Sequence, residues 1–102
     1  MKKELNFNRT ELEKMLKLFS NLADETRLKI ILTLIERPKT VNEIHNSIGK
    51  EKLTLSAISH QLKLLYNSDL LIYERNGKNK SYSLSNKFCW CILKNSFEHF
   101  RN

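Results

Sequence analysis

The side chains best suited to chemistry in this sequence lie between residues 54 and 65. Read as a helix at about 100° per residue, this stretch places its large apolar groups on one side: Leu55, Ile58, Leu62 and Leu65. The other side has no acidic group and carries hydroxyls, an imidazole and an ammonium, on Ser56, Ser59, His60 and Lys63. Such groups can reach base edges and phosphates if the helix lies in the major groove of DNA. The alternative is an ordinary solvated helix face, and the neighbouring segments must decide between the two.

The charge balance favours a polyanionic partner. The 102 residues contain 18 Lys and Arg against 11 Asp and Glu, a formal net charge of +7. The excess is spread along the chain, so a lysine-rich solvated surface remains the alternative. The length predicts one small domain over residues 1–102. Dimerisation would allow a domain of this size to bury additional surface.

The chain has the features of a cytoplasmic protein. No apolar run is long enough to span a bilayer, and no apolar segment follows the charged N-terminus. Two cysteines, Cys89 and Cys91, cannot build a disulfide framework, in agreement with a reducing compartment. We therefore expect a soluble protein with no membrane partner.

Two helices are predicted before residue 39, after a flexible polar arm over residues 1–7. Asn8 or Thr10 can begin the first helix, and Thr10 with Glu13 matches a capping box. Asp24 is the expected N-cap of the second helix, which Pro38 stops. The second helix is apolar enough to be the central buried one.

Residues 40–67 have the form of a helix-turn-helix. Thr40 and Glu43 match a capping box for a short helix, and Gly49 follows where a positive φ is expected. A polar turn then leads to Thr54, which can cap the helix described first. His45 in the short helix has no partner in sequence, so we expect it to face solvent.

Residues 70–84 predict a β-hairpin. Asn76-Gly77 is a strong turn dipeptide between two strand-like segments. The hairpin end is basic, with Arg75, Lys78 and Lys80. A basic hairpin directly after a candidate recognition helix is the wing of a winged helix-turn-helix; the alternative is a hairpin that covers the core edge with incidental charges.

Residues 86–100 predict a final helix too aromatic to face water. It can pack on its own core or, together with the first helix, across a two-fold axis, and we favour the axis because paired recognition helices require a symmetric dimer. The expected interface consists of Leu12, Met15, Leu16, Phe19, Trp90, Leu93, Phe97 and Phe100.

Three stretches together resemble the ArsR/SmtB family of winged-helix repressors. LADETRLKI at 22–30 resembles the opening of the family, with Glu25 in place of its usual proline. SAISHQLKLL at 56–65 matches the family's recognition helix, and 70–78 with 82–84 match its strands and wing. One departure is the turn at 50–53, about three residues longer than usual in the family.

The resemblance implies a mainly α fold with a β-hairpin wing: four helices with the fourth as recognition helix, the hairpin, and a last helix. It implies a homodimer, joined through the first and last helices, that represses transcription from an inverted-repeat operator. The residues implied to contact double-stranded DNA are Thr54, Ser56, Ser59, His60, Gln61, Lys63, Arg75, Lys78 and Lys80.

Many members of the family bind an inducer metal, but the corresponding positions here lack the ligands. Residues 40–43 contain no thiolate, and of the last-helix positions Asn86, Phe88, His99 and Asn102 only His99 could bind zinc. Two cysteines two apart on a helix point about 200° from each other, so they cannot chelate one ion and would make a poor disulfide. We expect two buried cysteines, no metal and no cofactor; Cys89, Cys91 and His99 are the remaining candidates, and the inducer is unknown.

The leading hypothesis is therefore a sequence-specific DNA-binding repressor. The alternative is a protein-interaction module that uses the winged helix as a scaffold. An enzyme is not expected, because the sequence has no phosphate-binding glycine loop or clustered carboxylates. Ser59 and His60 diverge by about 100° on an exposed helix face and offer no water-excluding pocket.

Overall fold

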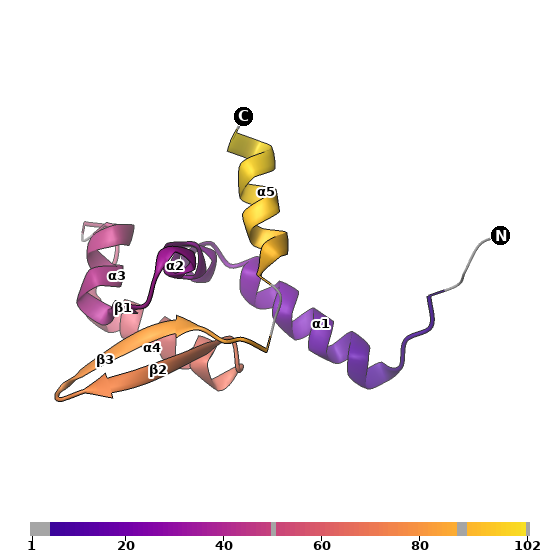
Figure 1. Cartoon of the computed structure of the whole chain (residues 1–102), viewed down its shortest axis with the longest axis horizontal. Helices are drawn as coiled ribbons and strands as arrows, with labels where there is room; N and C mark the ends of the chain where they lie inside the picture. Colours follow the sequence, from indigo (N-terminus) through magenta and orange to yellow (C-terminus); the bar gives the residue numbers. More distant parts are fainter. Residues whose placement is uncertain (1–4, 50, 88–89, 102) are drawn as a thin grey trace.

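The computed structural model describes residues 5–49, 51–87 and 90–101 of the chain. Helices lie around a small antiparallel sheet (Figure 1). The elements are α1 (Arg9–Leu22), α2 (Glu25–Glu36), β1 (Lys39–Thr40), α3 (Val41–Ile48), α4 (Leu55–Asn67), β2 (Leu71–Asn76), β3 (Asn79–Leu84) and α5 (Cys91–Arg101). The winged helix-turn-helix fold is confirmed.

The helices begin where short polar side chains satisfy the first backbone amides. Asp24, Thr40 and Thr54 accept hydrogen bonds from the amides of Arg27, Glu43 and Ala57, at the N-caps of α2, α3 and α4. These three starts are confirmed.

Of the two N-caps predicted for the first helix, Asn8 and Thr10, the structure has Asn8. Asn8 caps α1 in a reciprocal pair with Glu11, each side chain accepting from the other's backbone amide at 2.8 Å. The capping box of Thr10 and Glu13 was therefore wrong, because Thr10 already lies inside the helix.

The described strands form a sheet in the order β1-β3-β2. The hairpin pairs Asn76 with Asn79, so Gly77 and Lys78 make a two-residue turn, and Gly77 adopts a φ of 62° that favours glycine. The two residues of β1 pair with β3 through Lys39 and Tyr82. Their pairing was not predicted, since two residues carry no strand periodicity.

The core lies between α2, α3, α4 and the hairpin. Its buried apolar residues are Leu22, Ile30, Ile31, Leu34, Ile44, Ile58, Leu62, Leu65, Leu70, Leu71 and Tyr82. The inward face of α4 is confirmed for its isoleucine and for Leu62 and Leu65. The prediction that Leu55 faces inward was wrong. Its side chain is 41% exposed, because Leu55 is the first residue of α4 and lies before the helix reaches the core.

α1 and α5 project from this core (Figure 1). The radius of gyration is 15.4 Å, against about 13 Å for a compact chain of this length. α5 begins at Cys91 and none of its described side chains is buried, so the predicted start near residue 86 was too early. Among the described helices, none is both long and apolar enough to cross a membrane.

Candidate nucleic-acid interface

The outer face of α4 presents polar side chains to solvent. Ser56, Ser59, His60 and Lys63 are exposed, and Thr54 is exposed at the N-cap. α4 contains no Asp or Glu. This face can therefore approach a polyanion without carboxylate repulsion.

Gln61 lies beside this face, but its side-chain oxygen is already engaged. It accepts a hydrogen bond of 2.8 Å from Nε of Arg27 in α2. The same guanidinium donates from Nη1 to Oδ1 of Asn21 at the end of α1, at 3.0 Å. Arg27 thus joins three helices, and only the amide nitrogen of Gln61 remains to donate to a ligand. Arg27 belongs to the motif at residues 22–30, but no sequence pattern indicates these contacts.

A histidine holds the turn between α3 and α4. His45 is half-buried, and its Nε2 hydrogen-bonds the backbone carbonyl of Leu53. The expectation that His45 faces solvent was wrong, because the turn folds back over it. The contact orients the start of α4 relative to α3.

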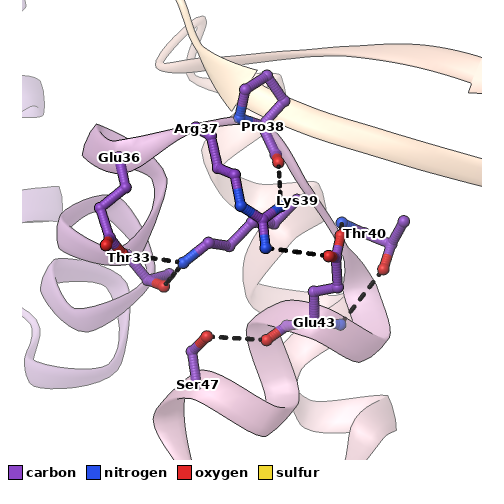
Figure 2. Close-up of polar contacts among 8 residues, drawn as sticks. All are labelled: Thr33, Glu36, Arg37, Pro38, Lys39, Thr40, Glu43 and Ser47. Atoms are coloured by element: carbon purple, nitrogen blue, oxygen red, sulfur yellow. Dashed lines mark hydrogen bonds and ion pairs between the residues drawn. The ribbon is translucent and has the colours of Figure 1, made fainter.

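A polar cluster fixes α3 against the end of α2 (Figure 2). Lys39 is buried, and its ammonium donates to Thr33 at 2.7 Å and pairs with Glu36 at 3.2 Å. Arg37 pairs with Glu43 at 3.1 Å. These contacts tie together two helix ends that only a short strand connects, so they set the direction of the helix-turn-helix.

The capping box of α3 shifts the titration of Glu43. Its pKa is lowered, first by the hydrogen bond from the backbone amide of Thr40 and then by the side-chain bond from Arg37. A lowered pKa means that the folded state favours the carboxylate. The stabilisation is present above the ordinary value of 4.5 and is lost as the pH falls through the lowered pKa.

Glu43→Gln should consequently flatten the acid limb of the stability curve. The wild-type free energy of unfolding should fall more steeply with acidification below about pH 4.5 than that of the variant, because glutamine cannot gain a proton. Urea unfolding over a pH series measures this. Glu51→Gln, in the exposed turn before α4, is the control; parallel wild-type and Glu43→Gln profiles would contradict the assignment.

The wing is held by aromatic stacking. The ring of Tyr73 lies 5.0 Å from that of Tyr66 on α4 and 5.6 Å from that of Tyr82. Lys80 is half-buried, with its ammonium 4.6 Å from the Tyr73 ring centroid. Arg75 and Lys78 are exposed near the tip. The predicted wing cations therefore divide into two that face outward and one that packs on the hairpin.

The predicted interface residues also divide into two groups. Trp90 and Leu93 are half-buried against the core of their own chain, and Trp90 donates from Nε1 to the Ser85 carbonyl at 2.7 Å. Leu12 is half-buried on α1. The exposed remainder forms two apolar faces on α1 and α5: Met15, Leu16, Phe19, Phe97 and Phe100.

Comparison with known proteins assigns the family. A model of the bacterial regulatory proteins of the arsR family matches residues 24–73. A cadmium resistance transcriptional regulatory protein CadC homolog from Staphylococcus aureus is 36% identical over 86 residues, which cover 83% of this chain and 69% of that protein. The chain belongs to the ArsR family.

Two further relatives of this ArsR-family chain are longer. The transcriptional repressor SmtB homolog of Synechocystis is 30% identical over 89 residues, covering 87% of this chain and 65% of its own length. The regulator NmtR of Mycobacterium tuberculosis is 35% identical over 78 residues, covering 76% of this chain and 62% of its own length. The chain thus spans less than two thirds of either protein.

Solved structures share the fold of the ArsR-family chain. HlyU from Vibrio cholerae superposes with a TM-score of 0.80 at 21% identity, over 93% of this chain and all of that one. A homodimeric winged helix-turn-helix DNA-binding domain of Mb0332 from Mycobacterium bovis gives 0.76 at 20% identity, over 98% and 94%. Both superpositions support the predicted fold class.

Cys91 and His99 are the metal candidates of this ArsR-family chain that the structure describes. Within the described residues, no group of three His, Cys, Asp or Glu side chains could hold a metal ion. His99 instead lies edge-on to Phe100, at 4.9 Å between ring centroids.

The cysteine expectations are corrected in part. Cys91 is exposed at the start of α5 and disulfide-bonded, so it is neither buried nor a free thiol. Cys89, the other cysteine of the sequence, lies outside the described residues.

Proposed function

We propose that this chain acts as a homodimeric repressor that binds an inverted-repeat operator in double-stranded DNA. The observation that carries the proposal is the acid-free outer face of α4, with Ser56, Ser59, His60 and Lys63 exposed together. Hydroxyl, imidazole and ammonium groups are suited to base edges and phosphates in a major groove. The repressor and homodimer named among the relatives support the same function.

In this proposal the two outward wing cations contact the DNA backbone. Arg75 lies on β2 just before the turn, and Lys78 lies in the turn itself; both would neutralise phosphates flanking the major-groove site. Lys80 contributes less, because its ammonium already lies over Tyr73. Thr54 and the amide nitrogen of Gln61 complete the contact surface.

The two apolar faces would join two copies. Dimerisation through α1 and α5 would cover Leu16, Phe19 and Phe97, which otherwise face water. A two-fold axis there would place two α4 helices on one side of the dimer, as an inverted-repeat operator requires.

The first test is selection of bound sites from random duplexes, followed by affinity measurements at several salt concentrations. We expect a palindromic site, bound more tightly than random DNA by about 10³-fold or more. Equal affinity for all duplexes would contradict operator recognition, and no DNA binding at all would contradict the whole proposal.

The wing predicts a sequence-independent effect. Lys78→Ala should weaken binding to operator and random duplexes by the same factor, and should reduce the slope of log affinity against log salt by about 1. Lys80→Ala, which removes the same charge from the Tyr73 ring, is the matched control and should change the slope less. A larger slope change for Lys80→Ala would show that the wing meets DNA through its other face.

A further inference from the structure

A pocket of about 430 Å³ lies where α1, the α4–β2 turn and the segment after β3 meet. α1 contributes Lys14, Lys17, Leu18 and Asn21, and the other walls include Asp69 and Lys87. The volume falls within the range of small-molecule sites, roughly 300–1,000 Å³. It does not overlap the α4 face or the wing tip assigned to DNA above.

The charge of this pocket favours an anion. Lys87 pairs with Asp69 at 3.7 Å, and both side chains are about two thirds exposed. Among the described residues, the ammonium groups of Lys14 and Lys17 make no ion pair, so two positive charges remain uncompensated at the α1 wall. Leu18 beside them offers apolar surface to the rest of a small organic molecule.

The pocket and the apolar face of α1 point in opposite directions. At about 100° per residue, Lys14, Lys17 and Asn21 lie on one side of α1, whereas Leu16 and Phe19 lie on the other. A second copy that covers the apolar face would leave the pocket open. The pocket is therefore not a remnant of the uncovered dimer surface.

The pocket is also remote from the DNA-contacting tip of the wing. Its walls lie just before β2 and just after β3, at the base of the hairpin, whereas the turn at Gly77 lies at the far end (Figure 1). The six residues of β2 span roughly 20 Å at about 3.3 Å each. A phosphate held by the wing tip would not reach Lys14 or Lys17.

A chain of hydrogen bonds connects the pocket to α4. Asn21 is only 6% exposed, and its Nδ2 donates to the carbonyl of Lys17 at 2.9 Å. Its Oδ1 accepts from Arg27, whose Nε donates to Gln61 on α4. A ligand that displaces the Lys17 turn of α1 would thus disturb the contact that holds the Gln61 side chain.

We propose that this pocket binds a small organic anion through Lys14 and Lys17, and that Asn21 and Arg27 transmit its presence to Gln61. The ligand class is a phosphorylated or polycarboxylic small molecule, since both present multiple negative charges to the two ammonium groups. Anion binding stands independently of DNA binding; the effect on operator affinity rests on the proposed function.

The test is an NMR titration of the ¹⁵N-labelled full chain with pyrophosphate and, separately, with citrate. Ionic strength is held at about 150 mM so that long-range screening is constant. We expect saturable shifts at the amides of residues 14–21 and 68–70, and at the side-chain amide of Gln61. The tighter of the two probes identifies the phosphorylated or the polycarboxylic class.

Two charge-matched variants make the result specific. Lys14→Gln/Lys17→Gln should weaken binding about tenfold, whereas Lys52→Gln/Lys94→Gln removes two exposed charges elsewhere and should leave the affinity unchanged. Equal weakening by both variants, shifts centred on the wing, or no saturation with either probe would overturn the site.

The connection to α4 has its own readout. In Arg27→Met, a change outside the pocket wall, the pocket amides should still shift on saturation while the Gln61 side-chain signal stays in place, because the link from Asn21 to Gln61 is cut. A Gln61 signal that does not move in the wild type would overturn the connection, whether or not the protein binds DNA. Operator affinity with and without the bound probe then measures regulation separately.

Discussion

Leu16→Glu should convert the protein from a dimer to a monomer. Leu16 is 57% exposed on α1, where the proposed interface would bury it. In a two-fold dimer each substitution occurs twice, so two carboxylates lose their hydration together. At about 2 kcal/mol for each copy, the dimer dissociation constant should rise about 10³-fold. Sedimentation at micromolar concentrations measures the change, and operator affinity should fall with it.

A matched variant tests whether the position or the charge is responsible. Ile72→Glu introduces the same carboxylate at a site that is 49% exposed on β2, away from α1 and α5. It should leave the dimer intact, and Phe97→Glu on α5 should behave like Leu16→Glu. A monomeric wild type, or a Leu16→Glu protein that stays dimeric, would contradict the proposed interface.

His60→Ala should separate base reading from backbone contact. The imidazole is exposed at the middle of the outer face of α4, where a helix in the major groove meets base edges. Its loss should cost about 1–3 kcal/mol on the selected operator and little on random DNA. Competition binding with both duplexes measures the difference.

Lys63→Ala is the contrasting variant on the same helix. The Lys63 ammonium is assigned to the DNA backbone, so its removal should weaken binding to the operator and to random DNA by the same factor. If His60→Ala also weakens binding to the operator and to random DNA by the same factor, His60 contacts phosphate and does not read the base sequence.

Much of the scaffold was predictable because its signals are local. The N-caps Asp24, Thr40 and Thr54 bond to amides three residues along the chain, so their type and spacing are legible in the sequence. Asn8 and Thr10 offered two such signals close together, and only the folded chain distinguishes them.

The contacts that modify the candidate site are long-range. Arg27 and Gln61 are 34 positions apart, and no periodicity relates them. His45 reaches Leu53 only because the lengthened turn folds back over α3. Lys80 looks like any wing cation in sequence, but the pairing of β2 with β3 brings it over Tyr73. Residue type predicted which groups could touch DNA, whereas tertiary packing determines which of them are available.

The attachment of α5 has a mechanical consequence. Within the described chain, Trp90 just before α5 and Leu93 near its start pack against the core of their own subunit, and no side chain of α5 is buried. The turns of α5 beyond Leu93 therefore contribute no buried side chain to the core of their own subunit. In the proposed dimer, two subunits joined through these turns would rotate about their axis by changing interface contacts alone, so the distance between their two α4 helices would change while each core stays folded.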